Sequence, residues 1–187
     1  MATSMVVFDL DACCWDPEMY ELWGGGAPFT QESVEPNNTL KDNRGTVVRL
    51  LSDVAASFAD LYRRMEAGEP LLVGIASRSD EPEWARECLR KFLVAEGVCM
   101  MDVVTEARCE IYGGSKQKHL KALQRKTSIP FDRMCFFDDQ SGNIQDVGAL
   151  GVHCFLTPRG VTTELYERGL AAATRGAAGS GWNAFSP

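Results

Sequence analysis

Short apolar runs that end abruptly in polar residues recur along this chain, and stretches of helical periodicity separate them. Apolar runs of this length are typical of strands buried on both faces of a parallel sheet, because helices cover such sheets on both sides. The pattern therefore predicts an α/β fold, a doubly wound parallel sheet with helices on both faces. The runs interpreted as sheet strands are residues 6–11, 71–76, 98–104, 134–137 and 152–156.

Five stretches are predicted to be helical, because their apolar residues recur at intervals of three and four. The longest begins at Val47 and continues to Met65, after which Gly68 and Pro70 would end it. Asp80 is a suitable N-cap for the second helix. The predicted helices are residues 47–65, 82–94, 116–126, 144–150 and 161–173.

The segment between the first strand and the first helix, residues 12–46, mixes aromatic residues with glycine and proline. We interpret it as an ordered flap, an irregular loop or short hairpin, because disordered segments are poor in aromatic residues. Trp15, Trp23 and Phe29 are expected to line the entrance of a site beneath this flap. A disordered insertion is the alternative.

Length and composition limit the class of protein. The 187 residues fit one domain, residues 1–173, followed by a flexible tail at 174–187 that is rich in Gly, Ala and Ser. A net charge of −7 argues against nucleic acid as a partner, since such binding needs a basic surface.

No run approaches the ~18 apolar residues of a membrane helix, and the chain starts without a secretory signal. The seven cysteines are scattered and include no C-x-x-C pair, so we expect reduced thiols, no zinc site and a cytoplasmic protein.

Polar side chains follow three of the predicted strands, and the carboxyl ends of parallel strands lie along one edge of a sheet. Ligands bind at that edge, near the point where the strand order reverses. Lys116 begins a predicted helix that faces the same edge. Two carboxylates held close together raise each other's pKa, and a divalent cation such as Mg²⁺ removes that penalty. The residues expected to meet there are Asp9, Asp11, Ser77, Arg78, Lys116, Asp138 and Asp139.

These residue types suit phosphoryl transfer. A carboxylate is ionised at neutral pH and can attack phosphorus without a base, and we assign that role to Asp9. Asp11 is positioned to protonate the leaving oxygen and then to deprotonate water. Mg²⁺ would bridge Asp9 and a phosphate oxygen, and Asp138 or Asp139 would supply another carboxylate.

Each residue also has an ordinary structural interpretation when it is considered alone. Ser77 would be a turn residue, Lys116 a solvated helix residue, and Asp138 with Asp139 a turn and an N-cap. Their order along the chain is more specific than any single member.

That order resembles the haloacid dehalogenase (HAD) superfamily of phosphohydrolases, and within it the magnesium-dependent phosphatase branch. The resemblance spans roughly residues 5–156. It implies a Rossmann-like HAD core with a short flap in place of a large cap domain. The matching motifs are Phe8-Asp9-Leu10-Asp11 with Trp15, Ala76-Ser77-Arg78, Ile111-Tyr112-Gly113-Gly114-Ser115-Lys116, Phe136-Phe137-Asp138-Asp139 and Asn143-Ile144-Gln145-Asp146-Val147.

The resemblance also implies roles for individual residues. Asp9 would be the nucleophile, and Asp11 the general acid and base whose backbone carbonyl binds Mg²⁺. Asp138 would bind the metal directly, with Asp139 beside or behind it. Lys116 would steady the nucleophile and the phosphate. The residues implied to bind the phosphate of the substrate are Ser77, Arg78 and Lys116.

The implied substrate is a phosphorylated sugar or other small metabolite, or phosphotyrosine in a protein. Cys13 stands where the family has threonine, and a thiol hydrogen-bonds weakly. A catalytically weak phosphate-binding module is therefore the alternative. A receiver-like signalling module is disfavoured, because receivers carry the acidic pair and the phospho-acceptor on separate early strands.

Overall fold

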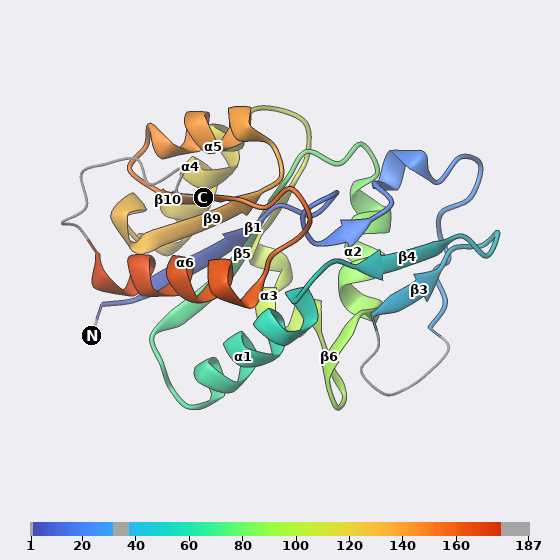
Figure 1. Cartoon of the computed structure of the whole chain (residues 1–187), viewed down its shortest axis with the longest axis horizontal. Coiled ribbons are helices and arrows are strands. Elements are labelled where there is room, and N and C mark those ends of the chain that lie inside the picture. Colours follow the sequence, from blue (N-terminus) through green and yellow to red (C-terminus); the bar gives the residue numbers. More distant parts are fainter. Residues whose placement is uncertain (1, 32–37, 177–187) are drawn as a thin grey trace.

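The computed structural model describes residues 2–31 and 38–176, and its centre is a five-stranded parallel sheet (Figure 1). Strand β1 lies in the middle, and the strand order is β10-β9-β1-β5-β8. The doubly wound parallel sheet predicted from the sequence is therefore confirmed. The five strands are β1 (Ser4–Phe8), β5 (Leu71–Ser77), β8 (Cys109–Ile111), β9 (Met134–Asp138) and β10 (His153–Leu156).

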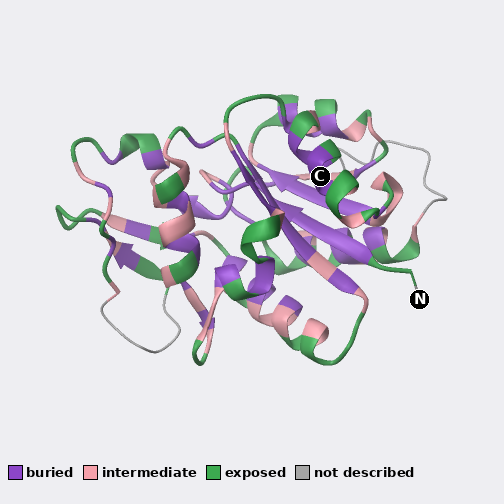
Figure 2. Cartoon of the chain, turned by 180° about the vertical axis from the view of Figure 1, so that it is seen from behind, coloured by how far each residue is buried: buried purple, intermediate pink, exposed green. Residues whose placement is uncertain are grey.

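Helices cover both faces of this sheet. The helices are α1 (Val54–Glu66), α2 (Pro82–Lys91), α3 (Met100–Val104), α4 (Lys116–Thr127), α5 (Ser141–Gly148) and α6 (Thr163–Arg175), with short 3₁₀ turns at η2 (Glu106–Arg108) and η3 (Phe131–Arg133). Phe8 and Phe137 join α1, α3 and α6 in one hydrophobic cluster, whereas Val7 and Phe136 join α4 and α5 in another. Successive strand residues point to opposite faces, which explains why residues 5–8 of β1 and 134–137 of β9 are all apolar. Figure 2 shows most residues of the central strands as buried, whereas the edge strand β10 is only partly buried.

The chain reverses its direction across the sheet beside β1. From β1 it proceeds to β5 and β8 on one side, and then it crosses to β9 and β10 on the other. The carboxyl ends of β1 and β9 are neighbours, and the backbone N–H of Asp9 donates to the carbonyl of Phe137 at 2.9 Å. The carboxylates that follow these two strands are thereby placed at the switch point of the sheet.

The flap forms a small sheet beside the carboxyl edge of the parallel sheet, and this sheet also includes residues 47–50, directly after the predicted flap (Figure 1). Its antiparallel strands, in the order β2-β4-β3, are β2 (Trp15–Asp16), β4 (Val47–Leu50) and β3 (Thr39–Lys41), and the 3₁₀ turn η1 (Met19–Glu21) follows β2. The helix predicted to begin at Val47 instead begins at Val54, so that prediction was wrong for residues 47–53. Val48 and Leu50 are buried while Arg49 is exposed, and pairing with two strands outweighs the helical spacing.

Residues 93–111 differ most from the prediction. The strand predicted at residues 98–104 is wrong: β7 (Val98–Cys99) pairs only with β6 (Leu93–Ala95), and α3 follows directly. The fifth sheet strand is β8, which has three residues and is too short to stand out as an apolar run. The predicted Asp80 cap is also wrong, because the N-cap position of α2 is Glu81 and Pro82 starts the helix.

The remaining helices and strands lie within a few residues of their predicted positions. All seven cysteines are free, as expected for reduced thiols. No helix among residues 2–31 and 38–176 is both long and apolar enough to cross a membrane. Most of the tail predicted at residues 174–187 lies outside the described residues. Its first two residues belong to α6, which continues to Arg175.

Candidate active site

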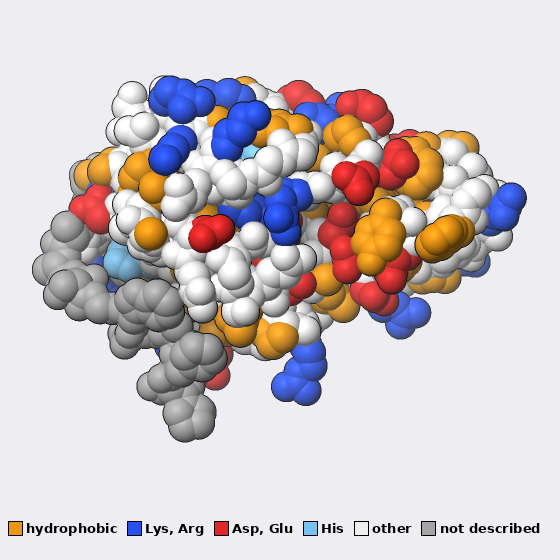
Figure 3. All heavy atoms as spheres, turned by 90° about the horizontal axis from the view of Figure 1, so that it is seen from above, with side chains coloured by type: hydrophobic (Ala, Val, Ile, Leu, Met, Phe, Trp, Pro, Cys, Tyr) orange, Lys and Arg blue, Asp and Glu red, His pale blue; other side chains and the backbone are white. Residues whose placement is uncertain are grey.

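An open cleft of about 380 Å³ lies at the carboxyl edge of the parallel sheet, beside the flap. Figure 3 shows acidic side chains gathered toward the flap end of this face, and Lys and Arg side chains over the sheet end. The residues that line the cleft are Asp9, Asp11, Glu18, Tyr20, Ser77, Arg78, Ser79, Asp80, Gly113, Gly114, Lys116 and Gln140.

Asp9 follows β1 directly and is only 6% exposed. Its Oδ1 atom accepts a hydrogen bond from the backbone N–H of Leu10 at 2.8 Å and lies 2.6 Å from Nζ of Lys116. Burial raises the pKa of Asp9 to about 7, with a further increase from Asp138, although Lys116 opposes both. The carboxylate is thus held by two donors in a site that costs it much of its hydration.

Lys116 begins α4 because Ser115 caps the helix, its side chain accepting from the N–H of Lys118. The Lys116 side chain is buried, which the interpretation as a solvated helix residue did not anticipate. Its Nζ donates to the carbonyl of Ala76 at 2.7 Å, and it lies 3.1 Å from Oδ2 of Asp138. With its ion pair to Asp9, one ammonium group joins the ends of β1, β5 and β9.

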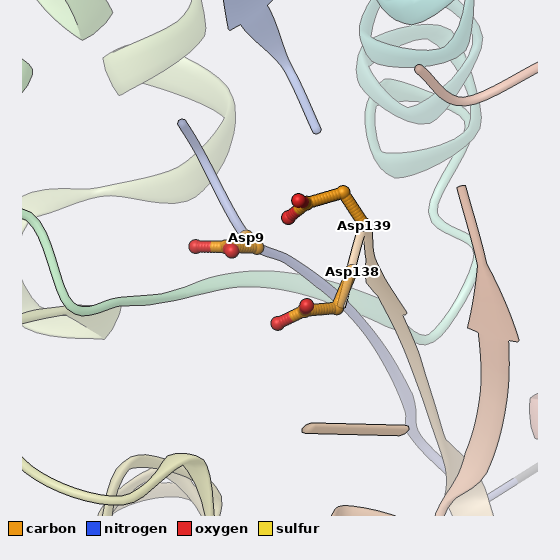
Figure 4. A group of neighbouring side chains, drawn as sticks. All are labelled: Asp9, Asp138 and Asp139. Atoms are coloured by element: carbon orange, nitrogen blue, oxygen red, sulfur yellow. The ribbon is translucent and has the colours of Figure 1, made fainter. Parts of the chain in front are cut away.

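Three carboxylates lie together at this edge of the sheet (Figure 4), and two of them contact the Lys116 ammonium group. One oxygen from each of Asp9, Asp138 and Asp139 lies within 4.8 Å of the others. Asp138 is fully buried and is oriented by two donors, the N–H of Gln140 at 2.8 Å and Nδ2 of Asn143 at 3.0 Å. The Oδ1 atom of Asp139 is buried and has no partner among the described residues, and burial raises the pKa of that carboxyl. A cluster of hard oxygen ligands with one unsatisfied member fits Mg²⁺.

Asp11 belongs to the flap side of the cleft and lies outside the three-carboxylate cluster. Its Oδ1 atom accepts from Nε1 of Trp15 at 2.7 Å and from the N–H of Met19 at 3.2 Å. Burial raises the pKa of Asp11, although the bond from Trp15 opposes that rise. Sequence reasoning did not identify Trp15 as the donor that orients Asp11, and the spacing of four residues was the available signal.

Ser77 and Arg78 end β5 and both line the cleft. The Ser77 hydroxyl is buried and accepts from the N–H of Ser79 at 3.2 Å. Arg78 is exposed, and its Nη2 donates to Oε1 of Gln140 at 2.8 Å. The pair Arg78–Gln140 connects the loop after β5 with the loop after β9.

The aromatic residues expected at the entrance are mostly elsewhere. Trp15 and Phe29 are fully buried in the hydrophobic core, so that expectation was wrong for them, and Trp23 is 81% exposed. Tyr20 lines the cleft in their place. Cys13 is also fully buried, with its Sγ 3.2 Å from Oγ1 of Thr157, and burial raises the pKa of its thiol well above the usual range.

Comparisons with known proteins agree with this geometry. The family model for acid phosphatases matches residues 2–175. Magnesium-dependent phosphatase 1 of Homo sapiens is 35% identical over 170 residues, which cover 89% of this chain and 84% of the relative. A HAD-like hydrolase superfamily protein of Schizosaccharomyces pombe is 30% identical over 151 residues, which cover 79% of this chain and 81% of that protein.

Solved structures support the fold. The N-terminal part of a Bacteroides fragilis protein, which contains a phosphatase domain and is complexed with Mg, aligns with a TM-score of 0.57 at 18% identity. The alignment covers 91% of this chain and 40% of that one. A mutant of CbbY from Rhodobacter sphaeroides, in complex with xylulose-(1,5)-bisphosphate, aligns with a TM-score of 0.51 at 12% identity, over 87% of this chain and 89% of that one.

Proposed function

Because this chain belongs to the acid phosphatase family of the HAD superfamily, we propose that it hydrolyses phosphoric monoesters through an aspartyl-phosphate formed on Asp9. The predictions of a HAD phosphatase and of magnesium as its cofactor agree with these relatives. The observation that carries the proposal is the convergence of three carboxylates and the Lys116 ammonium group at the switch point of the sheet.

In the first step, a carboxylate oxygen of Asp9 attacks phosphorus, and the bond between phosphorus and the leaving oxygen breaks. The donors Leu10 and Lys116 both reach Oδ1, so we assign the attack to Oδ2. The leaving oxygen takes a proton from Asp11. A raised pKa suits Asp11 to that role, because it increases the fraction of the carboxyl that carries a proton.

In the second step, water attacks the phosphorus of the aspartyl-phosphate and gives a proton to Asp11. Inorganic phosphate leaves, and Asp9 returns to its carboxylate form while Asp11 is again protonated. Trp15 supports this exchange, because its N–H fixes one oxygen of Asp11 while the carboxyl gains and loses its proton.

Magnesium would be held by Asp9, Asp138 and Asp139, and the resemblance adds the backbone carbonyl of Asp11. The bound ion would supply positive charge to the phosphate oxygens. The orphaned oxygen of Asp139 supports its inclusion among the ligands. Asn143 would orient Asp138 through its side-chain amide.

The phosphate would be bound by Ser77, Lys116 and the N–H groups of the loop at Gly113 and Gly114, all of which line the cleft. Arg78 lies farther out and is exposed, so it suits the leaving group as well as the phosphate. The substrate would be a phosphosugar or a phosphotyrosine-type ester, since no separate cap domain closes the cleft among the described residues.

Turnover of p-nitrophenyl phosphate with and without Mg²⁺ tests the proposal. We expect Mg²⁺-dependent release of phosphate, and a loss of about 10³-fold or more in kcat for Asp9→Asn, because the nucleophile is removed. Asp16→Asn, an exposed carboxylate of the flap, is the matched control and should retain activity. An inactive wild-type protein that still binds phosphate would favour the weak binding module instead.

A further inference from the structure

His119 is a buried, titratable side chain that the proposed reaction does not use. It lies one turn after Lys116 on α4 and is fully buried. Its Nε2 atom is 2.9 Å from the carbonyl oxygen of Tyr112. Its Nδ1 atom is buried and has no partner within the described part of the chain. A buried ring with one bonded and one orphaned nitrogen needs an explanation.

The hydrogen-bond partner determines the form of the imidazole ring. A carbonyl oxygen can only accept, so Nε2 carries the hydrogen and Nδ1 is the bare acceptor. Burial lowers the pKa of His119, which keeps the ring neutral. His119 is therefore a neutral donor aimed at one backbone carbonyl.

Tyr112, which receives that bond, is held at both of its backbone groups. Its N–H donates to the carbonyl of Ser77 at 3.1 Å, and its carbonyl accepts from His119. The rings of Tyr112 and His119 also meet edge to face, with 4.4 Å between their centroids. The contacts join the end of β5, the end of β8 and the first turn of α4.

The next two residues, Gly113 and Gly114, line the cleft. Gly114 has a φ of +134°, a conformation that residues with a Cβ rarely adopt. Two consecutive glycines give the backbone many alternative paths, so the direction in which the chain leaves Tyr112 determines where their N–H groups lie. We propose that His119 is a positioning residue, which fixes the Tyr112 carbonyl and thereby the glycine loop that would bind the phosphate.

This inference deepens the proposed function and rests on it for its kinetic consequences. Lys116 has partners in Ala76, Asp9 and Asp138, which hold the ammonium group without help from His119. Loss of the histidine bond should therefore loosen phosphate binding more than it slows the chemical steps. The effect should appear in KM and in the affinity for inorganic phosphate.

Two substitutions of similar length separate the hydrogen bond from packing. His119→Met removes the donor, whereas His119→Gln keeps an amide N–H that can reach the Tyr112 carbonyl. We expect His119→Met to raise KM for p-nitrophenyl phosphate, and to weaken binding of inorganic phosphate with Mg²⁺, by about tenfold. The kcat value should change less than threefold by the same reasoning, and His119→Gln should restore KM. Should His119→Met fail to fold, His119→Asn replaces it, since its amide is too short for the bond.

His153 provides a matched control within the same chain. Its Nε2 atom lies 3.0 Å from the carbonyl of Asp132, and it begins β10 at the end of the sheet opposite the cleft. His153→Met should lower stability without changing KM. Hydrogen exchange at the amides of residues 112–115 should accelerate in His119→Met and remain unchanged in His153→Met.

Equal KM values for His119→Met, His119→Gln and the wild type would overturn the inference, as would unchanged exchange at residues 112–115. Calorimetric titration with inorganic phosphate and Mg²⁺ does not depend on turnover. A wild-type protein that binds phosphate but hydrolyses no ester would therefore refute the proposed function. The phosphate-binding and hydrogen-exchange data would still test the role of His119 in that case.

Discussion

The edge of the parallel sheet and the flap each bury an aspartate, and the two carboxyls behave in opposite ways. Asp9 is 6% exposed and Asp42, in the flap, is 4% exposed. Burial raises the pKa of Asp9 to about 7. Burial also opposes ionisation of Asp42, but hydrogen bonds from the N–H groups of Gly26, Thr46 and Arg44 lower its pKa overall.

The difference shows how environment assigns a role to the same side chain. Three neutral N–H groups, at 2.7 to 3.1 Å, stabilise the ionised form of Asp42 without any cation. Asp9 instead shares its surroundings with Asp138 and Asp139, an arrangement that calls for a cation. The flap carboxylate serves structure, and the carboxylates at the sheet edge remain available for chemistry.

The flap is also fixed to the core rather than only lying beside it. Glu87 on α2 accepts from the N–H of Phe29 at 2.8 Å, and Nζ of Lys91 donates to the carbonyl of Phe29. Trp84, on the same helix, lies so close to Gly26 that an added Cβ would approach its ring to 2.3 Å. The flap wall of the cleft therefore has a defined position relative to the carboxyl edge of the sheet.

The largest expected effect on stability comes from removing the cation at the edge of the parallel sheet. Lys116→Met leaves Asp9 and Asp138 buried without their cation, so the free energy of unfolding should fall by about 3 kcal/mol or more. Urea unfolding measures this change, and added Mg²⁺ should recover part of it. Lys121→Met on the exposed face of α4 is the control. A Lys116 variant as stable as that control would contradict the paired-charge description.

The corresponding change in the flap is Asp42→Ala. Three backbone N–H groups would lose their acceptor, and the free energy of unfolding should fall by about 2 kcal/mol. Asp42→Asn retains one acceptor oxygen and should lie between the alanine variant and the wild type. Activity on p-nitrophenyl phosphate should be retained in both variants, whereas bulky substrates should show higher KM. Loss of kcat in Asp42→Ala would mean that the two regions are not separable.

Trp15→Phe tests the shorter of the two hydrogen bonds that the flap donates to Asp11, the proposed acid. The substitution keeps an aromatic ring in the core but removes the donor to Asp11. Loss of a hydrogen bond to a charged group costs about 1.5 kcal/mol, so kcat should fall about tenfold. Trp84→Phe, at a different contact between the flap and the core, should leave kcat unchanged. Equal kcat values for both variants would remove Trp15 from the catalytic arrangement.

The smallest effect concerns a bond remote from the cleft. The Tyr166 hydroxyl on α6 donates to Oδ2 of Asp60 on α1 at 2.7 Å. Burial alone would raise the pKa of Asp60, but hydrogen bonds from Arg64 and Tyr166 lower it. At neutral pH, Tyr166→Phe should therefore cost about 1 kcal/mol of stability and leave kcat unchanged.

The pH dependence of that difference has a defined sign. The pKa of Asp60 is lower in the folded chain than its usual value of about 3.9. Its stabilising contribution is complete above about pH 4 and is lost as the pH falls through the folded-state pKa. The stability difference between the wild type and Tyr166→Phe should accordingly shrink on acidification, with Tyr62→Phe on the same helix as the control.

Prediction from the sequence was most successful where an apolar run was followed directly by polar residues. Strands β1, β5 and β9 and helix α4 lie close to their predicted ranges, because both their hydrophobic pattern and their end signals are local. It failed at β4, where residues 47–50 fit the helical spacing but pair with two strands. It failed again at β8, whose three residues carry too little pattern.

Some residues of the candidate site were likewise identified from the sequence, and others only from the structure. The motifs identified the carboxylates, Ser77 and Lys116, and they predicted correctly that acidic groups from both ends of the chain converge. They did not identify the bond from Trp15 to Asp11 or the orphaned nitrogen of His119. Those features depend on how a side chain is buried and which atom it meets, which residue types and spacing do not specify.

The sequence by itself determined the α/β class, the order of the chemical groups and the sheet edge at which they lie. These follow from side-chain periodicity and from the shared direction of parallel strands. Only the tertiary structure decided which carboxyl has its ionised form stabilised by hydrogen bonds and which has it destabilised by burial. The pKa of each carboxyl depends on its burial and on partners that are far away in the sequence. Asp9 and Asp42 are the same residue in the sequence, and their surroundings alone give them opposite pKa shifts.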